Sequence, residues 1–125
     1  MIKTFSLLLT FLMSSVGFSQ STSSEIIQAF RTGNAEKVSA YFDNTLEITV
    51  DKHNKVYKKS DAATFISGFF SENNVKDFKV LHQSESGGSF YCIGNLVTSS
   101  GTFRTTFYAK EKGGKTVVQE IRFEK

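Results

Sequence analysis

The chain has 125 residues, of which 15 are Lys or Arg and 12 are Asp or Glu, so its formal net charge is +3. A chain of this length forms one domain around one core, and its mild, interspersed charge argues against a polyanionic partner such as nucleic acid. Cys92 is the only cysteine, which excludes an intrachain disulfide.

The first twenty residues have the plan of a secretory signal peptide. Lys3 gives a basic start, a long apolar run follows, and small residues lead up to Ser19. We predict cleavage after Ser19 or Gln20, which gives a signal peptide at 1–19 and a single domain at 20–125. A membrane anchor or a buried helix is the less favoured interpretation, because the run is shorter than the roughly 20 apolar residues of a membrane span.

Export would place the mature protein in the periplasm or the medium. It removes cytosolic partners, nucleotides and nucleic acid from the expected ligands, and no integral membrane segment is expected in the mature chain. No cysteine comes directly after the predicted cleavage site, so we do not expect a lipid anchor.

Two short helices are predicted at the start of the mature chain. Thr22 and Glu25 have the spacing of a capping box, which marks a helix start. Gly33 ends this helix, and Asn34 can cap a second one. The residues expected to face inward are Ile26, Ile27 and Phe30 in the first helix and Ala35, Val38, Tyr41 and Phe42 in the second.

A small hairpin and the strongest predicted helix come next. Residues 46–50 alternate as a half-buried strand does, residues 51–55 read as a polar turn, and residues 56–57 return,. Ser60 is a good N-cap for the following helix, which we expect to end at residues 72–74. Its apolar stripe has helical spacing and consists of Ala62, Phe65, Ile66, Phe69 and Phe70,.

The last fifty residues predict an antiparallel meander, because glycine-containing turns separate four β-rich segments. Gly94 lies inside one segment and indicates a bulge or a bend. The expected strands are residues 78–85, 89–99, 102–110 and 115–124. Helices gathered on one side of a curved antiparallel sheet make an α+β domain.

This order of elements resembles the NTF2-like (cystatin-like) cone, in which a bent sheet wraps helices and leaves a pocket between them. More specifically, the sequence resembles an uncharacterised family of small exported bacterial proteins, a domain of unknown function. The segments that carry this resemblance are Phe78-Lys-Val-Leu-His-Gln83, Tyr91-Cys-Ile-Gly94, Gly101-Thr-Phe-Arg104, Gly33-Asn-Ala-Glu-Lys-Val-Ser-Ala-Tyr-Phe42 and the pair Phe69-Phe70.

The resemblance implies the fold and export but supplies no activity and no catalytic residues. The wider NTF2-like group includes isomerases and dehydratases that use Asp, His or Tyr inside the cone, and other members that only bind or dimerise. Fold does not decide between these.

His82 is the one candidate catalytic residue. It follows Phe78 and Val80 at a period of two, so we expect it on the same face, where a half-buried histidine can act as a general base. The alternative is a core or rim histidine bound to a backbone carbonyl. His53 lies in the predicted polar turn and is expected to be solvated.

The candidate ligand-binding residues are Arg104, Tyr91 and Tyr108. Arg104 is expected on the face opposite Phe103, where its planar fork would hold an anion if that face lines the cone and would be a surface charge if it faces water. The tyrosines, Tyr57 included, could offer hydroxyls at a pocket mouth. The alternative is that their rings pack on the sheet while their hydroxyls are solvated.

Three further patterns favour structural roles. Cys92 lies in an apolar strand and reads as a buried, inert thiol. Glu120 and Arg122 share the face opposite Ile121 and read as a surface pair. The two histidines and one cysteine are scattered, so no metal site is predicted, and no motif predicts a cofactor,.

The sequence therefore predicts an exported, non-catalytic domain whose cone binds a small ligand or a protein partner. Its sparse acid–base inventory and aromatic interior favour this hypothesis. The alternative is a small isomerase- or dehydratase-like enzyme with His82 as base. A homodimer formed through the outer face of the sheet is a further hypothesis.

Overall fold

The computed structural model describes residues 19–125. Nearly all of the predicted signal peptide lies outside the described residues, so it stays a prediction. The described elements, in chain order, are α1 Ser19–Arg31, α2 Ala35–Ala40, β1 Phe42–Val50, β2 His53–Lys58, α3 Lys59–Asn73, β3 Val75–Ser86, β4 Ser89–Thr98, β5 Gly101–Lys112 and β6 Lys115–Glu124.

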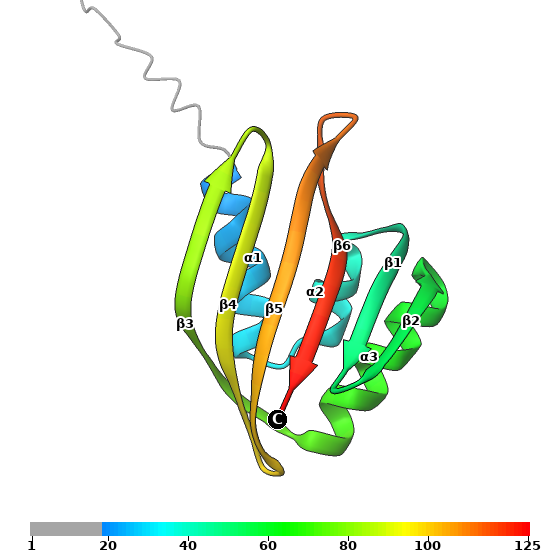
Figure 1. Cartoon of the computed structure of the whole chain (residues 1–125), viewed down its shortest axis with the longest axis vertical. Coiled ribbons are helices and arrows are strands. Elements are labelled where there is room, and N and C mark those ends of the chain that lie inside the picture. The colour runs from blue at the N-terminus through cyan, green and yellow to red at the C-terminus, as the bar shows by residue number, and fades with distance from the viewer. Residues whose placement is uncertain (1–18) are drawn as a thin grey trace, which may run out of the picture.

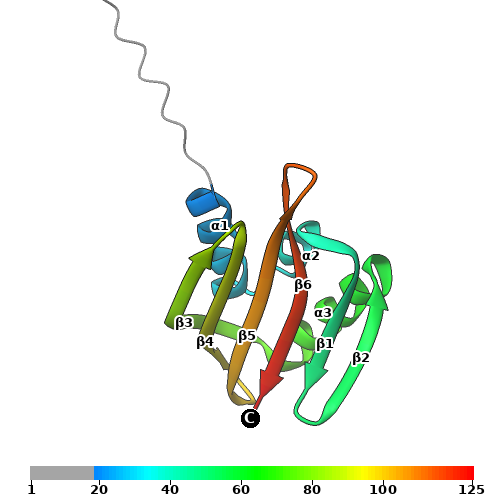
Figure 2. The same cartoon turned by 45° about the horizontal axis from the view of Figure 1, so that its top comes forward.

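The strands form one six-stranded sheet in the order β2-β1-β6-β5-β4-β3. Neighbouring strands are antiparallel except β1 and β6, which pair in parallel. The helices lie together on one face of this curved sheet, and no helix of residues 19–125 lies on its other face (Figure 1). Figure 2 shows α3 beside the β1–β2 hairpin at one side of the sheet and α1 beside β3 and β4 at the other. The predicted α+β class is confirmed.

The core fills the space between the helices and the inner face of the sheet. Phe30 of α1 stacks on Phe107 of β5, with ring centroids 5.1 Å apart, and Phe69 of α3 stacks on Phe123 of β6 at 4.3 Å. Such aromatic pairs add roughly 0.5–1.5 kcal/mol to the free energy gained by burying their area. In the predicted stripe of α3, Ala62, Ile66, Phe69 and Phe70 are buried, and Phe65 is half-buried.

The turn between α1 and α2 is as predicted, but the start of α1 is not. Gly33 has a φ of +64°, and a Cβ there would lie 2.8 Å from the Cβ of Val75, so the turn needs glycine. The Asn34 side chain accepts a hydrogen bond from the Lys37 amide at 3.0 Å and caps α2. The predicted capping box is wrong, because α1 begins at Ser19 and Glu25 is already inside the helix.

The predicted four-stranded meander is confirmed. The bulge lies in β3, on the strand opposite Gly94. Val80 pairs with Gly94 and His82 with Ile93, so β3 has one extra residue at this point. A Cβ on Gly94 would lie 2.8 Å from the Lys79 carbonyl oxygen and closer still to the Phe78 ring. The glycine therefore lets the bulged strand and its buried ring approach β4.

The hairpin is longer and its turn tighter than predicted. Val50 pairs with His53, so only Asp51 and Lys52 form the turn, and Asp51 takes a positive φ of 53°. Asp tolerates this conformation better than most residues because its short side chain bonds locally. The predicted N-cap at Ser60 is wrong, since α3 starts at Lys59 after an N-cap at Lys58.

Candidate functional site

A cavity of about 600 Å³ lies between the β1–β2 hairpin and α3. We call it the hairpin pocket. Its volume is in the usual range for small-molecule sites. It is lined by Ile48, Val50, His53, Asn54, Lys55, Tyr57, Phe65, Phe69, Glu72, Asn73 and Phe103.

Aromatic rings form the main wall of the hairpin pocket. Tyr57 lies 5.3 Å from Phe65 between ring centroids, Phe65 lies 6.2 Å from Phe69, and Phe69 lies 5.2 Å from Phe103. We call these four residues the aromatic row. Phe69 and Phe103 are buried in the core, whereas Tyr57 and Phe65 are half-buried. The row therefore joins the rigid core to an accessible apolar surface.

Polar side chains surround this apolar wall. His53 and Lys55 come from β2, and Glu72 and Asn73 come from the end of α3. The Lys55 ammonium lies 5.1 Å from the centroid of the Tyr57 ring. The Asn73 side-chain amide donates a hydrogen bond to the Phe69 carbonyl at 2.8 Å, which fixes this side chain against the last turn of α3.

Sequence reasoning missed this site because it assigned His53 and Lys55 to a turn. With a two-residue turn, His53, Lys55 and Tyr57 pair with Val50, Ile48 and Leu46, whose side chains face the core. Directly opposed residues in an antiparallel pair point to the same face. The sequence carries no clear signal for this, since His53 and Lys55 are polar like the turn residues before them.

The expected face of His82 is wrong. The bulge after Val80 shifts the phase of β3 by one residue, and a one-residue shift turns every later side chain to the other face. His82 therefore pairs with Ile93 on the outer face and is exposed. The bulge depends on the cross-strand contact at Gly94, which a period-two pattern in β3 alone does not reveal.

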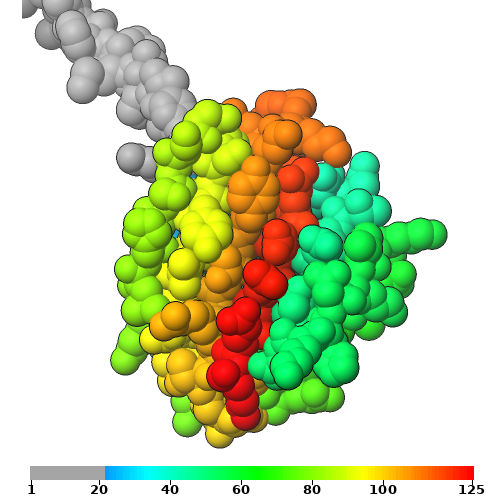
Figure 3. All heavy atoms as spheres, viewed as in Figure 1, coloured from blue at the N-terminus to red at the C-terminus, as the bar shows by residue number. Residues whose placement is uncertain are grey.

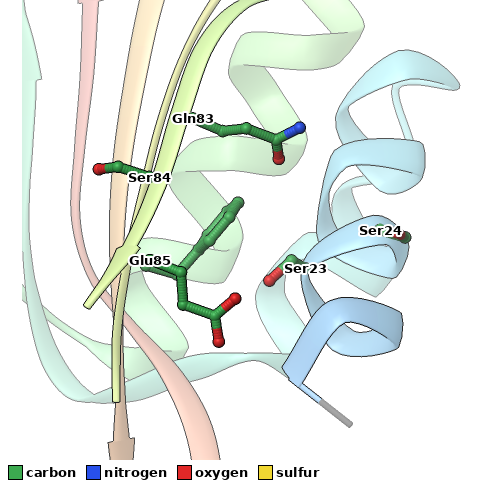
Figure 4. Close-up of a pocket in the computed structure, with 6 residues that line it drawn as sticks. Ser23, Ser24, Gln83, Ser84 and Glu85 are labelled. Carbon is green, nitrogen blue, oxygen red and sulfur yellow. The ribbon is translucent and has the colours of Figure 1, made fainter. Parts of the chain in front are cut away.

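The same bulge turns Gln83 and Glu85 to the inner face. Figure 4 shows both side chains pointing from β3 toward α1, where the Ser23 hydroxyl points back, while Ser84 points away. The cavity between them has a volume of about 320 Å³. We call it the polar pocket. It is lined by Ser23, Ser24, Gln83, Ser84, Glu85 and Phe90.

The structure places Arg104, Tyr91 and Tyr108 on the outer face of β4 and β5. Tyr91 pairs with Tyr108, and the Tyr108 hydroxyl lies 2.9 Å from the Ser89 hydroxyl. Arg104 is exposed and lies on the same face. These residues line neither the hairpin pocket nor the polar pocket. Their face is the uncovered one that fills the view in Figure 3.

Two structural interpretations from the sequence are confirmed. Cys92 is buried, and this burial raises the pKa of its thiol to about 12, so the reactive thiolate is disfavoured,. Arg122 and Glu120 form a surface ion pair with a distance of 3.8 Å between Nε and Oε1. Such exposed pairs contribute little to stability.

A third cavity, of about 690 Å³, lies on the outside of α1 and α2. The Tyr41 hydroxyl donates a hydrogen bond to the Glu25 carboxylate there. That hydrogen bond, together with burial and the negative charge of Glu25, raises the pKa of Tyr41 to about 12. The phenol is therefore a neutral donor that holds the chain after α2 against α1.

Neither a metal site nor a membrane span is evident in residues 19–125. No group of three or more His, Cys, Asp or Glu side chains is placed to hold a metal ion. The helices of this part of the chain are too short or too polar to cross a bilayer.

Comparison with known proteins supports the fold and a family. Residues 23–124 match the family described as a domain of unknown function, DUF4783. No curated protein matches the chain significantly.

Solved structures of DUF4783 proteins superpose closely. One from Bacteroides ovatus has a TM-score of 0.79 at 27% identity and covers 82% of this chain and 93% of its own. One from Bacteroides uniformis has a TM-score of 0.78 at 28% identity and covers 82% and 94%. An NTF2-like protein of unknown function from Cytophaga hutchinsonii has a TM-score of 0.63 at 12% identity, over 89% and 92% of the two chains, and shows the fold alone. The resemblance to an uncharacterised NTF2-like family is confirmed.

Proposed function

The chain belongs to the DUF4783 family of NTF2-like domains, and on that premise we propose that it is an exported, non-catalytic domain that binds a small, largely apolar ligand in the hairpin pocket. The observation that carries this proposal is the aromatic row, which combines rings fixed in the core with rings left half-exposed beside a cavity of about 600 Å³. Concave, mostly apolar sites with a few polar groups are where small ligands bind.

Export rests on the pattern of the leader, with its basic start, apolar run and small residues before Ser19,. An exported domain has no access to cytosolic nucleotide cofactors. The hairpin pocket and the polar pocket are lined by aromatic rings, side-chain amides, hydroxyls and a few charged groups. Such groups are suited to binding a small molecule.

Binding is preferred to acid–base chemistry because of where the proton carriers lie. His82 is exposed on the outer face, and among the described residues no hydrogen bond or ion pair orients its ring. A general base must be within hydrogen-bond reach of the proton that it removes. An isomerase-like reaction at His82 would need a substrate site on the open surface of the sheet.

The test is a ligand search on protein purified from the periplasm. Native mass spectrometry should find a co-purified small molecule, or a thermal-shift screen should find compounds that raise the melting temperature. Replacing Phe65 by Ala should weaken that binding, because it removes the most accessible ring between Tyr57 and Phe69. The matched control is Tyr91→Ala on the outer face. Failure to find any ligand by either method, or equal loss in both variants, would contradict the proposal.

A second candidate role is self-association through the outer face of the sheet. It is favoured by the cross-strand pair of Tyr91 and Tyr108 on that face, where Tyr91 is exposed, since tyrosine is enriched in interfaces,. A protein from Thiobacillus denitrificans with the same fold, at 8% identity and a TM-score of 0.65, is described as a putative kinase association domain. Sedimentation velocity at micromolar concentration should then show a dimer that Tyr91→Lys dissociates, and a monomer at all concentrations would end this candidate.

A further inference from the structure

We propose that the ligand of the hairpin pocket is a flat apolar molecule that carries one anionic group, held by Lys55. This inference rests on the proposed function and adds the chemical class of the ligand. It starts from two lysine ammonium groups, each of which lies over a ring at one end of the aromatic row.

Each end of the row has an ammonium group over a ring. The Nζ atom of Lys55 lies 5.1 Å from the Tyr57 centroid, and that of Lys125 lies 5.3 Å from the Phe103 centroid. Both distances are within the range of a cation–π contact. Lys55 also lines the hairpin pocket, so its ammonium lies beside the apolar wall. This charge would repel a cationic ligand and pair with an anionic one.

Apart from His53, the acidic and basic side chains in the lining are Glu72 and Lys55. Glu72 is the acidic residue in the lining, and it lies two helical turns after Phe65, which is about 10 Å along α3. Asp51 accepts a hydrogen bond from the Lys125 amide at 3.0 Å, so it lies near the Phe103 end. Of the charged residues in the lining, Lys55 is the one placed over a ring of the row, and that ring contacts Phe65.

The two features together define the ligand. The apolar body would lie along Phe65 and Phe69, where a flat ring system can stack. Its anionic group would lie at Lys55, whose compact ammonium has three donors and can pair with a carboxylate, a sulfonate or a phosphate. The His53 imidazole, which also lines the pocket, can donate one further hydrogen bond,.

The experiment uses three probes of the same shape and different charge: 2-naphthoate, 2-naphthamide and 2-naphthylmethylammonium. Each is titrated into the uniformly ¹⁵N-labelled mature chain while amide shifts of the β1–β2 hairpin and α3 are followed. We expect 2-naphthoate to bind roughly three- to tenfold more tightly than the amide and the ammonium to bind most weakly, which is the scale of one partly exposed charge pair.

Charge variants identify the residue responsible. Lys55→Gln should remove the preference for 2-naphthoate, Lys55→Arg should keep it, and Glu72→Gln should increase it. The control is Lys58→Gln, which removes the same charge from the opposite face of β2, where Lys58 pairs with Thr45. The affinity of 2-naphthamide should change little in all four variants.

The outcomes separate the two proposals. Equal binding of the three probes, or a preference for 2-naphthoate that survives Lys55→Gln, overturns the anionic class and leaves the pocket as a binding site. If no probe shifts the hairpin and α3 amides at millimolar concentration, the hairpin pocket itself is not the ligand site.

Discussion

Gly94 shows how a single residue determines the course of the sheet. Its missing side chain is what admits the Phe78 ring and the bulged backbone at Lys79. Because Phe78 is fully buried, the ring has no room to move away from an added methyl group.

We therefore expect Gly94→Ala to destabilise the domain by roughly 1–3 kcal/mol through overpacking. Urea unfolding at neutral pH measures this change in the free energy of unfolding. Gly68 provides a matched control, because it lies inside α3 with no atom within 4 Å of an added Cβ. Gly68→Ala should stabilise by about 0.5–1 kcal/mol. A neutral effect of Gly94→Ala would show that the strand can relax around it.

Asp43 is a second residue whose environment has a measurable consequence. It is buried at the start of β1 and accepts hydrogen bonds from Gln119 at 3.1 Å and from the Asn44 amide at 2.8 Å. Lys112 approaches it at 3.2 Å. These contacts, led by the Gln119 hydrogen bond, lower the pKa of the carboxyl below its usual value of 3.8, against an opposing effect of burial.

A lowered pKa in the folded state means that the charged form stabilises the fold. The contribution of Asp43 is complete at pH values above the usual 3.8 and is lost as the pH falls through the lower folded value. We expect Asp43→Asn to reduce the free energy of unfolding at neutral pH by roughly 1–3 kcal/mol, as expected for a buried group that loses charged hydrogen bonds. Below the folded pKa the two proteins should converge. Urea unfolding from pH 7 down to pH 2 measures this, and a constant difference over the range would contradict the assignment.

At the scale of elements, the sequence predicts correctly those features that depend on residues close together in the chain. The stripe of α3, the Gly33 turn and the Asn34 cap each rest on residues within one or two turns. The bulge in β3 depends instead on Gly94, which lies fourteen residues after Val80. The sequence predicts a bulge or a bend at Gly94 itself. A pattern read along one strand cannot say which of two paired strands takes the extra residue.

The hairpin pocket was hidden for a related reason. The apolar stripe predicted for α3 is buried at Ile66, Phe69 and Phe70, but Phe65 is only half-buried. Phe65 lies at the edge of that stripe, and whether it is covered depends on what the β1–β2 hairpin places over it. Only the two-residue turn brings Lys55 and Tyr57 to that position.

At the scale of the whole molecule, the two edges of the sheet are protected in different ways. The short edge strand β2 carries Lys55 and Lys58, and the long edge strand β3 carries the bulge at Leu81. Charges and bulges both disfavour pairing with a further strand. Association of copies is therefore expected through a face of the sheet, not through its edges.

The leader supplies the last prediction at this scale. Residues 23–124 match the family, so cleavage after Ser19 or Gln20 would leave all of the matched region in place. We expect the periplasmic protein to have the mass of a chain that begins at Gln20 or Ser21. Replacing Leu8 and Leu9 by Asp should block export, because it puts two charges into the apolar run that the export machinery must accept.

Cell fractionation and intact-mass spectrometry measure the outcome, with Lys3→Arg as a control that keeps the basic start and should be exported normally. The chain made without residues 1–19 should have the same melting temperature as the exported protein, since both contain the complete core. Uncleaved protein in the cytoplasm, from the unaltered chain, would contradict export and with it the exclusion of cytosolic ligands.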